Sequence, residues 1–282
     1  MIDLHVHTTA SDGQFSPSQI IQMAVDKGLS RIAITDHDTA AGLEEAKAAA
    51  QELKINFVAG TELNISFPTG EFHLLGLGFT HISPSLNEIF EDLVKSRQER
   101  NENIISKMQK DGVQISLEEV QKDYPDTILG RPHFAAELVK KKVVKNRQMA
   151  FDKYLAKGRP WYVDRVGANL DQAIVAIKES GGLPVVAHPM SLYLSWGKLP
   201  ETLQNFYERG VAGIEAYHPG ARMTECLRLE ELARKIGLFV TAGSDFHGPK
   251  VRADRKLGHT CNDKPIENRF WDEELGKYLN RI

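Results

Sequence analysis

Seven short apolar segments recur along this chain, and several of them are continuously apolar rather than alternating between apolar and polar residues. Strands that are buried on both faces of a parallel sheet have this continuous pattern. Helical patterns separate most of the segments, so strand and helix alternate. We therefore predict an α/β fold, a (β/α) barrel of seven parallel strands. The predicted strands are residues 2–4, 31–35, 56–60, 72–76, 183–187, 213–216 and 239–242.

Helix signals between these segments support the alternation. Ser16 is a suitable N-cap and Pro17 is suited to the first helical position, so a helix is expected to begin there. Further helices are expected at residues 42–53, 169–180 and 222–236, each directly before or after a predicted strand.

One long region interrupts the alternation between the fourth and fifth strands. Residues 86–162 are charged and helical in pattern, with no convincing strand, and we predict helices at 88–110, 117–122, 132–142 and 147–156. The predicted domains are therefore a barrel formed by residues 1–95 and 165–282, and a helical insertion at residues 96–164 that caps the substrate site.

Composition narrows the function. A formal net charge of −3 argues against the broad basic surface that binds duplex nucleic acid, although a small basic pocket for one phosphate is compatible with it. Two cysteines, Cys226 and Cys261, are too few for a disulfide framework or a cysteine-based zinc site. No segment approaches the roughly 20 apolar residues of a membrane span, and no signal sequence opens the chain, so a cytoplasmic location is expected.

Metal-binding residue types follow or occupy six of the seven predicted strands. The C-terminal ends of parallel barrel strands share one face, so these side chains should converge. A lone histidine at a strand end is usually a hydrogen-bonded structural residue, but so many titratable groups would be costly to bury unless they shared metal ions. Nine ligands suit two or three ions, and imidazole with carboxylate suits Zn, Mn or Fe. The nine are His5, His7, Asp12, His37, Glu62, His73, His188, Asp245 and His247.

The order of these motifs resembles that of the polymerase and histidinol phosphatase (PHP) family. The motifs are H-x-H-x4-D at the N-terminus, then T-D-H-D, G-x-E, a mid-chain histidine, A-H-P and S-D-F-H. The resemblance implies a distorted seven-stranded (β/α) barrel with two or three metal ions at the strand C-termini. It also implies which residues hold each ion. The first ion would be held by His5, His7, Glu62 and Asp245, the second by Glu62, His73 and His188, and the third by Asp12, His37 and His247.

One residue departs from the family pattern, and three segments resemble one branch of the family. Asp12 stands where some family members have histidine, which would change the third site. The insertion segments around Arg131 and Lys157, with the segment around His218, resemble a bacterial branch of the family. That branch includes nucleoside 3′,5′-bisphosphate phosphatases and the 5′-to-3′ exoribonuclease known as RNase AM.

The resulting hypothesis is a metal-dependent phosphoesterase that hydrolyses the 3′-phosphate of nucleoside 3′,5′-bisphosphates such as pAp. A metal-bound hydroxide would attack phosphorus, with manganese as the expected metal and zinc and iron as alternatives. Asp12, His37 and His218 are the predicted catalytic residues. The predicted substrate contacts are Arg131, His133, Lys157 and His218, in which an arginine grips phosphate bidentately and a lysine adds a point charge.

Three alternatives remain open at this point. The chain could be a 5′-to-3′ exoribonuclease acting on short 5′-phosphorylated RNA, a histidinol phosphatase, or a non-catalytic PHP module. The expected partners are a nucleotide substrate or short RNA, with no membrane, and the sequence leaves the oligomeric state open.

Overall fold

The computed structural model describes residues 1–124, 129–164 and 166–280, and the chain divides into two compact units. The first unit comprises Met1–Phe90 and Gly167–Ile282, and the second comprises Glu91–Val166.

The first unit is built on a single seven-stranded sheet with strands in chain order from β1 to β7. The backbone N–H of His7 donates to the carbonyl oxygen of Phe246 (3.0 Å), and that of Asp245 donates to the carbonyl oxygen of His5 (2.9 Å). These bonds join the segments that follow the first and last strands, so the sheet is nearly closed into a barrel and the predicted fold class is confirmed. The strands are β1 (Ile2–Asp3), β2 (Arg31–Ile34), β3 (Asn56–Ile65), β4 (Phe72–Leu77), β5 (Leu183–Val186), β6 (Gly213–Tyr217) and β7 (Phe239–Ala242).

The prediction that every strand is parallel is wrong for β4. This strand pairs antiparallel with both β3 and β5, while the other neighbouring strands pair parallel. Only residues 66–71 connect β3 to β4, and a parallel crossover needs a dozen or more residues. The two strands therefore form a hairpin, and the beginning of β4 lies beside the end of β3.

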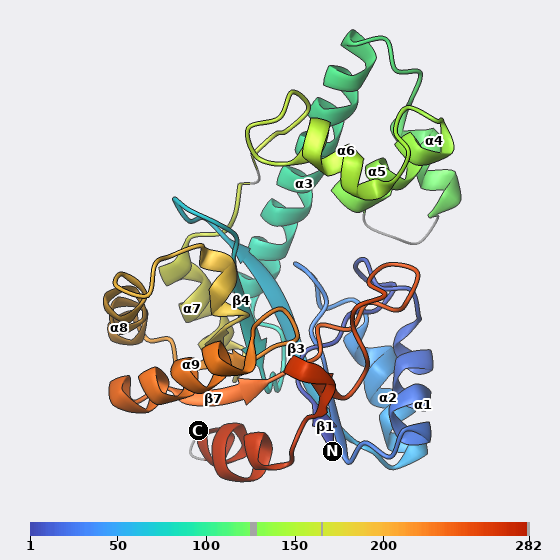
Figure 1. Ribbon diagram of the computed structural model, residues 1–282. Helices are drawn as coiled ribbons and strands as arrows, with labels where there is room; N and C mark the ends of the chain where they lie inside the picture. Colours follow the sequence, from blue (N-terminus) through green and yellow to red (C-terminus); the bar gives the residue numbers. More distant parts are fainter. Residues whose placement is uncertain (125–128, 165, 281–282) are drawn as a thin grey trace. The chain divides into compact units, whose positions relative to one another are not determined.

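Helices cover the outside of this sheet (Figure 1). The side chain of Ser16 caps the N-terminus of α1, as predicted from the sequence, and the side chain of Asn169 caps α7. In Figure 1, α1 and α2 lie on one side of the barrel and α7, α8 and α9 on the other. The helices of this unit are α1 (Pro17–Asp26), α2 (Leu43–Leu53), α7 (Leu170–Glu179), α8 (Leu199–Arg209), α9 (Met223–Ile236) and α10 (Gly276–Leu279).

Short elements complete the first unit. A two-stranded ribbon forms from β8 (His259–Thr260) and β9 (Lys264–Pro265), and a π-helical segment, Phe270–Leu275, precedes α10. The barrel core is apolar. It includes the fully buried side chains of Ile32, Ile34 and Leu74.

The second unit is helical, as predicted for the insertion. Helix α3 (Pro84–Lys110) begins in the first unit, four residues before the predicted start, and continues through the second. It is followed by α4 (Leu117–Asp123), α5 (Arg131–Lys140), α6 (Arg147–Ala150) and a π-helical turn, Phe151–Leu155. The second unit has its own hydrophobic core, which includes Met108, Phe134, Leu138 and Trp161. Among the helices described, none combines the length and apolarity needed to cross a bilayer.

Candidate metal centre

Two buried histidines that follow β1 are part of the candidate site. His5 and His7 alternate along an extended segment, so both side chains point to the same side. Their Nε2 atoms lie 3.1 Å apart, and neither residue is exposed to solvent. The bridge between Val6 and Phe246 fixes this segment against the residues that follow β7. The closure of the barrel therefore positions two imidazoles at its C-terminal face.

Glu62, inside β3, lies at the centre of the cluster. Its Oε2 atom is 3.3 Å from His5 Nε2, 3.2 Å from His7 Nε2 and 3.0 Å from His37 Nδ1. Its Oε1 atom is 2.8 Å from His73 Nδ1 and 2.9 Å from His188 Nε2. A single buried carboxylate therefore contacts the rings of five histidines.

The reversed strand β4 explains how His73 reaches this carboxylate. His73 is the second residue of β4 and is paired in register with Asn64, so it lies diagonally across the hairpin from Glu62. In a parallel strand, a residue at the beginning would lie at the opposite end of the barrel. The antiparallel orientation thus brings His73 to the face where the other strands end.

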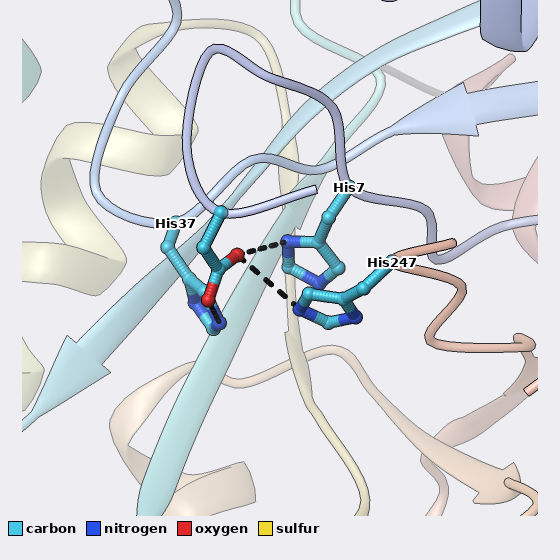
Figure 2. A group of neighbouring side chains, drawn as sticks. His7, His37 and His247 are labelled. Carbon is cyan, nitrogen blue, oxygen red and sulfur yellow. Dashed lines mark ion pairs between the residues drawn. The ribbon is translucent and has the colours of Figure 1, made fainter. Parts of the chain in front are cut away.

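A second part of the cluster surrounds Asp12 (Figure 2). Figure 2 shows the rings of His7, His37 and His247 directed toward one another, and each ring lies within 4.0 Å of an Asp12 oxygen. The buried carboxylate of Asp36 holds the loop that carries Asp12. It accepts hydrogen bonds from the hydroxyls of Thr8 (2.7 Å) and Ser11 (2.6 Å).

Asp245, just after β7, connects the histidine cluster to two further side chains. Its Oδ1 atom lies 3.4 Å from both His7 Nε2 and His247 Nδ1. Its Oδ2 atom lies 3.3 Å from His218 Nε2 and 3.6 Å from the Nε atom of buried Arg255. The φ angle of Asp245 is +53°, a conformation that most residues avoid, and such local strain often marks functional sites.

The nine predicted ligands therefore converge, in groupings that differ from the assignment implied by the family resemblance. His7 joins the group around Asp12, and Glu62 is shared between a group with His37 and His73 and a group with His5 and His188. A fourth group consists of His5, His7 and Asp245. The ligand atoms within each group lie within 4.8 Å of one another. Which residues share which ion stays a prediction.

Three buried polar atoms without hydrogen-bond partners in the described part of the chain indicate whether this cluster could bind metal ions. Nδ1 of His7, Nδ1 of His37 and Oε2 of Glu62 are buried and have no hydrogen-bond partner among the described residues. Buried polar groups normally have one, because leaving them unsatisfied costs about 1–3 kcal/mol each. Coordination of a divalent cation would satisfy all three atoms. The donor set of imidazole and carboxylate therefore fits the metal ions that the sequence predicts.

The electrostatics of the cluster also favour a bound cation. Burial raises the pKa of the Asp12, Glu62 and Asp245 carboxyls, but the surrounding imidazoles outweigh it and hold each pKa well below its usual range. Burial lowers the pKa of His7, but the adjacent carboxylates of Asp245 and Glu62 raise it to about 10. The three carboxylates, of which Glu62 and Asp245 are buried and Asp12 is partly exposed, thus stay ionised and favour positive charge nearby.

His218, which follows β6, is held in one tautomer. The backbone N–H of Gly220 donates to His218 Nδ1 (3.0 Å), so the proton of a neutral ring lies on Nε2, facing Asp245. Burial lowers the pKa of His218, which favours the neutral ring, although the hydrogen bond to Asp245 opposes this effect. His218 therefore presents an N–H donor beside the cluster.

The other predicted substrate contacts belong to the second unit. Arg131 and His133 lie in the first turn of α5, and His133 Nδ1 accepts a hydrogen bond from the backbone N–H of Gly130 (2.9 Å). The guanidinium of Arg131 lies 5.4 Å from the ring centre of Tyr162, and Lys157 is exposed. The contact of these side chains with substrate stays a prediction.

Two buried carboxylates in the site were not predicted. Asp36 orders the Asp12 loop, and Glu215 on β6 contacts His5. Both lie within motifs used to recognise the family, yet neither was assigned a role. For Glu215 the available signal was a charged residue in an otherwise apolar strand, since such a group is rarely buried without partners.

Comparison with known proteins gives the family. Residues 3–175 match the model of the PHP domain. The chain is 32% identical over 280 residues to a 3′,5′-nucleoside bisphosphate phosphatase of Chromobacterium violaceum, covering 99% of this chain and 98% of that protein. It is 33% identical over 259 residues to the 5′-3′ exoribonuclease Rnm of Escherichia coli, covering 90% and 88%.

A solved structure supports the same assignment. An amidohydrolase from Chromobacterium violaceum, with bound sulfate and no metal, matches the present fold with a TM-score of 0.86 at 31% identity, covering 99% of this chain and 96% of that one. The fold, the convergent ligand cluster and these similarities agree. The chain belongs to the PHP domain family, and it is a metal-dependent phosphoesterase.

Proposed function

We propose that this phosphoesterase removes the 3′-phosphate from nucleoside 3′,5′-bisphosphates such as pAp. The observation that carries the proposal is the convergence of the nine candidate ligands in one cluster, in a chain aligned over 99% of its length with a bisphosphate phosphatase. The nine residues would hold two or three divalent ions, with manganese as the expected metal.

The ions would supply water activation and would neutralise the phosphoryl oxygens. The protein's own residues supply orientation and charge. Asp12 and His37 lie in the groups that would hold the ions. His218, whose Nε2 proton faces the candidate ligand Asp245, is proposed to donate a hydrogen bond to a non-bridging phosphoryl oxygen of the substrate. Its lowered pKa favours this role over proton transfer to the leaving oxygen.

We propose that the helical insertion binds the 5′-phosphate of the substrate. Arg131 offers a planar guanidinium at the beginning of α5, and Lys157 offers an exposed ammonium group. Arginine suits bidentate phosphate binding and lysine adds a point charge. His133, at the same helix end as Arg131, is proposed to contact the substrate as well.

The second candidate function is 5′-to-3′ trimming of short 5′-phosphorylated RNA. The specific observation in its favour is the 33% identity to an exoribonuclease over 90% of the chain. The formal charge of −3 weighs against long strands, since non-specific nucleic-acid binding is dominated by basic side chains that contact the phosphate backbone. The two activities are chemically close because both recognise a 5′-phosphate and hydrolyse the next phosphoester.

A comparison of substrates tests the proposal. The manganese-loaded protein would be assayed for kcat/KM with pAp, 5′-AMP, histidinol phosphate and a 5′-phosphorylated RNA trinucleotide. The proposal expects pAp to be preferred, with release of the 3′-phosphate. Faster cleavage of the trinucleotide would make the exoribonuclease activity primary, and a preference for histidinol phosphate would establish the third candidate. A metal-loaded protein that turned over no substrate would support a non-catalytic module.

A further inference from the structure

The sixth strand contributes no predicted metal ligand, but it places one carboxylate directly behind the cluster. Glu215 lies in the middle of β6 with a side chain that is 1% exposed. Its Oε1 atom lies 3.0 Å from His5 Nδ1. Its Oε2 atom accepts a hydrogen bond of 2.9 Å from the backbone N–H of His188. One side chain thus contacts two candidate ligands that are 183 residues apart (188 − 5).

We propose that Glu215 is a positioning residue that fixes His5 and His188 for metal binding. The inference rests on the metal centre of the proposed function, and it adds a residue that does not itself touch the ions.

The contact with Glu215 determines which nitrogen of His5 carries the proton. An ionised carboxylate only accepts hydrogen bonds, so the neutral His5 ring donates from Nδ1. Its Nε2 lone pair then faces the cluster, where Nε2 lies 3.3 Å from Glu62 Oε2 and 3.7 Å from Asp245 Oδ1. Carboxylates that orient a ligating histidine in this way typically contribute 10–100-fold to metal affinity.

The second oxygen of Glu215 stabilises an unusual backbone. His188 has φ +28° and ψ +66°, a conformation that residues with a side chain rarely adopt. Such strain persists only where the surroundings over-determine it. The bond from the His188 N–H to Glu215 holds this turn, while the His188 ring bonds Ser191 through Nδ1 (2.9 Å) and faces Glu62 through Nε2.

The local packing is built around this carboxylate. Gly243 follows β7, and a Cβ atom placed there would lie 2.4 Å from Glu215 Oε1 and 2.2 Å from His5 Cβ. A residue with any side chain would therefore displace the Glu215–His5 contact. The absence of a side chain at position 243 leaves the two groups in direct contact.

Replacement of the carboxylate by an amide provides a sharp test. Both partners of Glu215 are donors, whereas glutamine offers one acceptor oxygen and one NH₂ donor group, so Glu215→Gln can satisfy only one of them. A matched control is Glu274→Gln. Glu274 is also buried, and it likewise accepts one backbone N–H on a barrel strand, from Val240 (3.2 Å), and one side-chain donor, from Arg234.

The primary measurement is Mn²⁺ affinity of the chelator-treated proteins by titration calorimetry. We expect Glu215→Gln to bind Mn²⁺ about 10–100-fold more weakly than wild type, with Glu274→Gln unchanged. Wild-type affinity in Glu215→Gln would overturn the positioning role and leave the metal centre intact. A wild-type protein that bound no Mn²⁺ would overturn the metal centre and this inference together.

A measurement on the wild-type protein keeps the inference falsifiable if Glu215→Gln does not fold. Nitrogen-15 NMR of the zinc-loaded protein reports the tautomer of each histidine ring. The inference expects the proton of His5 on Nδ1. A proton on Nε2 would overturn it, because Glu215 would then not be accepting from the ring.

Discussion

The Nε2 atoms of His5 and His7 lie 3.1 Å apart, and both are within 3.3 Å of the same oxygen of Glu62. Two ring nitrogens and a carboxylate oxygen in this arrangement lack enough protons to satisfy one another in the neutral state. A divalent cation held by His5, His7 and Glu62 would resolve the contact by accepting lone pairs from these side chains.

Replacing Glu62 by glutamine should remove metal and activity together. The change removes the one negative charge that contacts five histidines, so we expect metal content to fall and turnover to drop at least about 100-fold, given that even outer-shell changes cost 10–100-fold. Elemental analysis and phosphate release would measure the two effects. Full metal content in Glu62→Gln, or in Asp245→Ala, would contradict the ligand assignment.

Metal removal should lower thermal stability. An ion that binds only the folded state stabilises it by about 2.7 kcal/mol when its concentration is 100 times its Kd. We therefore expect Tm to fall after EDTA treatment and dialysis, and to recover when Mn²⁺ is added. Differential scanning calorimetry would measure both steps. An unchanged Tm in protein shown to have lost its metal would argue against a cluster that contributes to stability.

Arg131→Ala should weaken substrate use far more than metal binding. The proposed contact of the guanidinium with a substrate phosphate is bidentate and charge-assisted. Its loss should cost roughly 1.5–3 kcal/mol of binding free energy. We therefore expect kcat/KM for pAp to fall by about 10–100-fold. Metal content should stay at the wild-type level. Arg147→Ala, at an exposed position in the same unit, is the control. Equal kinetics for the two variants would remove Arg131 from the substrate site.

The contact between Glu230 and Arg269 should make stability depend on acid pH. Burial raises the pKa of Glu230, but hydrogen bonds from Arg269 and Tyr217 outweigh it and lower the pKa to about 2. A carboxyl with a depressed folded-state pKa stabilises the protein above its unfolded-state value of about 4.5 and loses this contribution as pH falls toward 2. The difference in unfolding free energy between wild type and Glu230→Gln should therefore shrink across this range. Urea denaturation at several pH values would show it, and a constant difference would refute the assignment.

Gly243→Ala should disrupt the site because the added methyl group would overlap the side chains of His5 and Glu215. The added Cβ would lie 2.2 Å from His5 Cβ, so the strand end or His5 must move, and overpacking of this kind costs about 1–3 kcal/mol or more. At Gly197, by contrast, the nearest atom to an added Cβ is 3.8 Å away. Thermal denaturation should show a loss for Gly243→Ala only. Equal stability of the two variants would mean that the region around His5 accommodates the methyl group.

The sequence predicted all seven barrel strands, because buried strands leave continuous apolar runs. It did not predict that β3 extends to Ile65, since residues 61–65 are mixed in polarity and are ordered by pairing with β4. The orientation of β4 was also mistaken, although the short connection at 66–71 carried the information. Helix α8 was missed, even though Leu199, Leu203 and Phe206 form a buried stripe at helical spacing.

The convergence of the nine candidate ligands was predictable because each occupies a recognisable motif at or near a strand. Their grouping was not, because it depends on ring orientations that sequence order does not determine. His7 illustrates the difference: its motif identifies it as a ligand, but only the fold places it beside both Glu62 and Asp12. Glu215 was overlooked because its role depends on two partners that lie far from it in the chain.

The β3–β4 hairpin has a mechanical consequence. Both connections of the insertion attach to it: β4 leads through residues 78–83 into α3, and the returning chain is bound where Ser66 N–H donates to Ala168 (2.9 Å). The same hairpin carries Glu62 and His73. Tension on the insertion would therefore be transmitted through the chain to the hairpin that carries two candidate metal ligands.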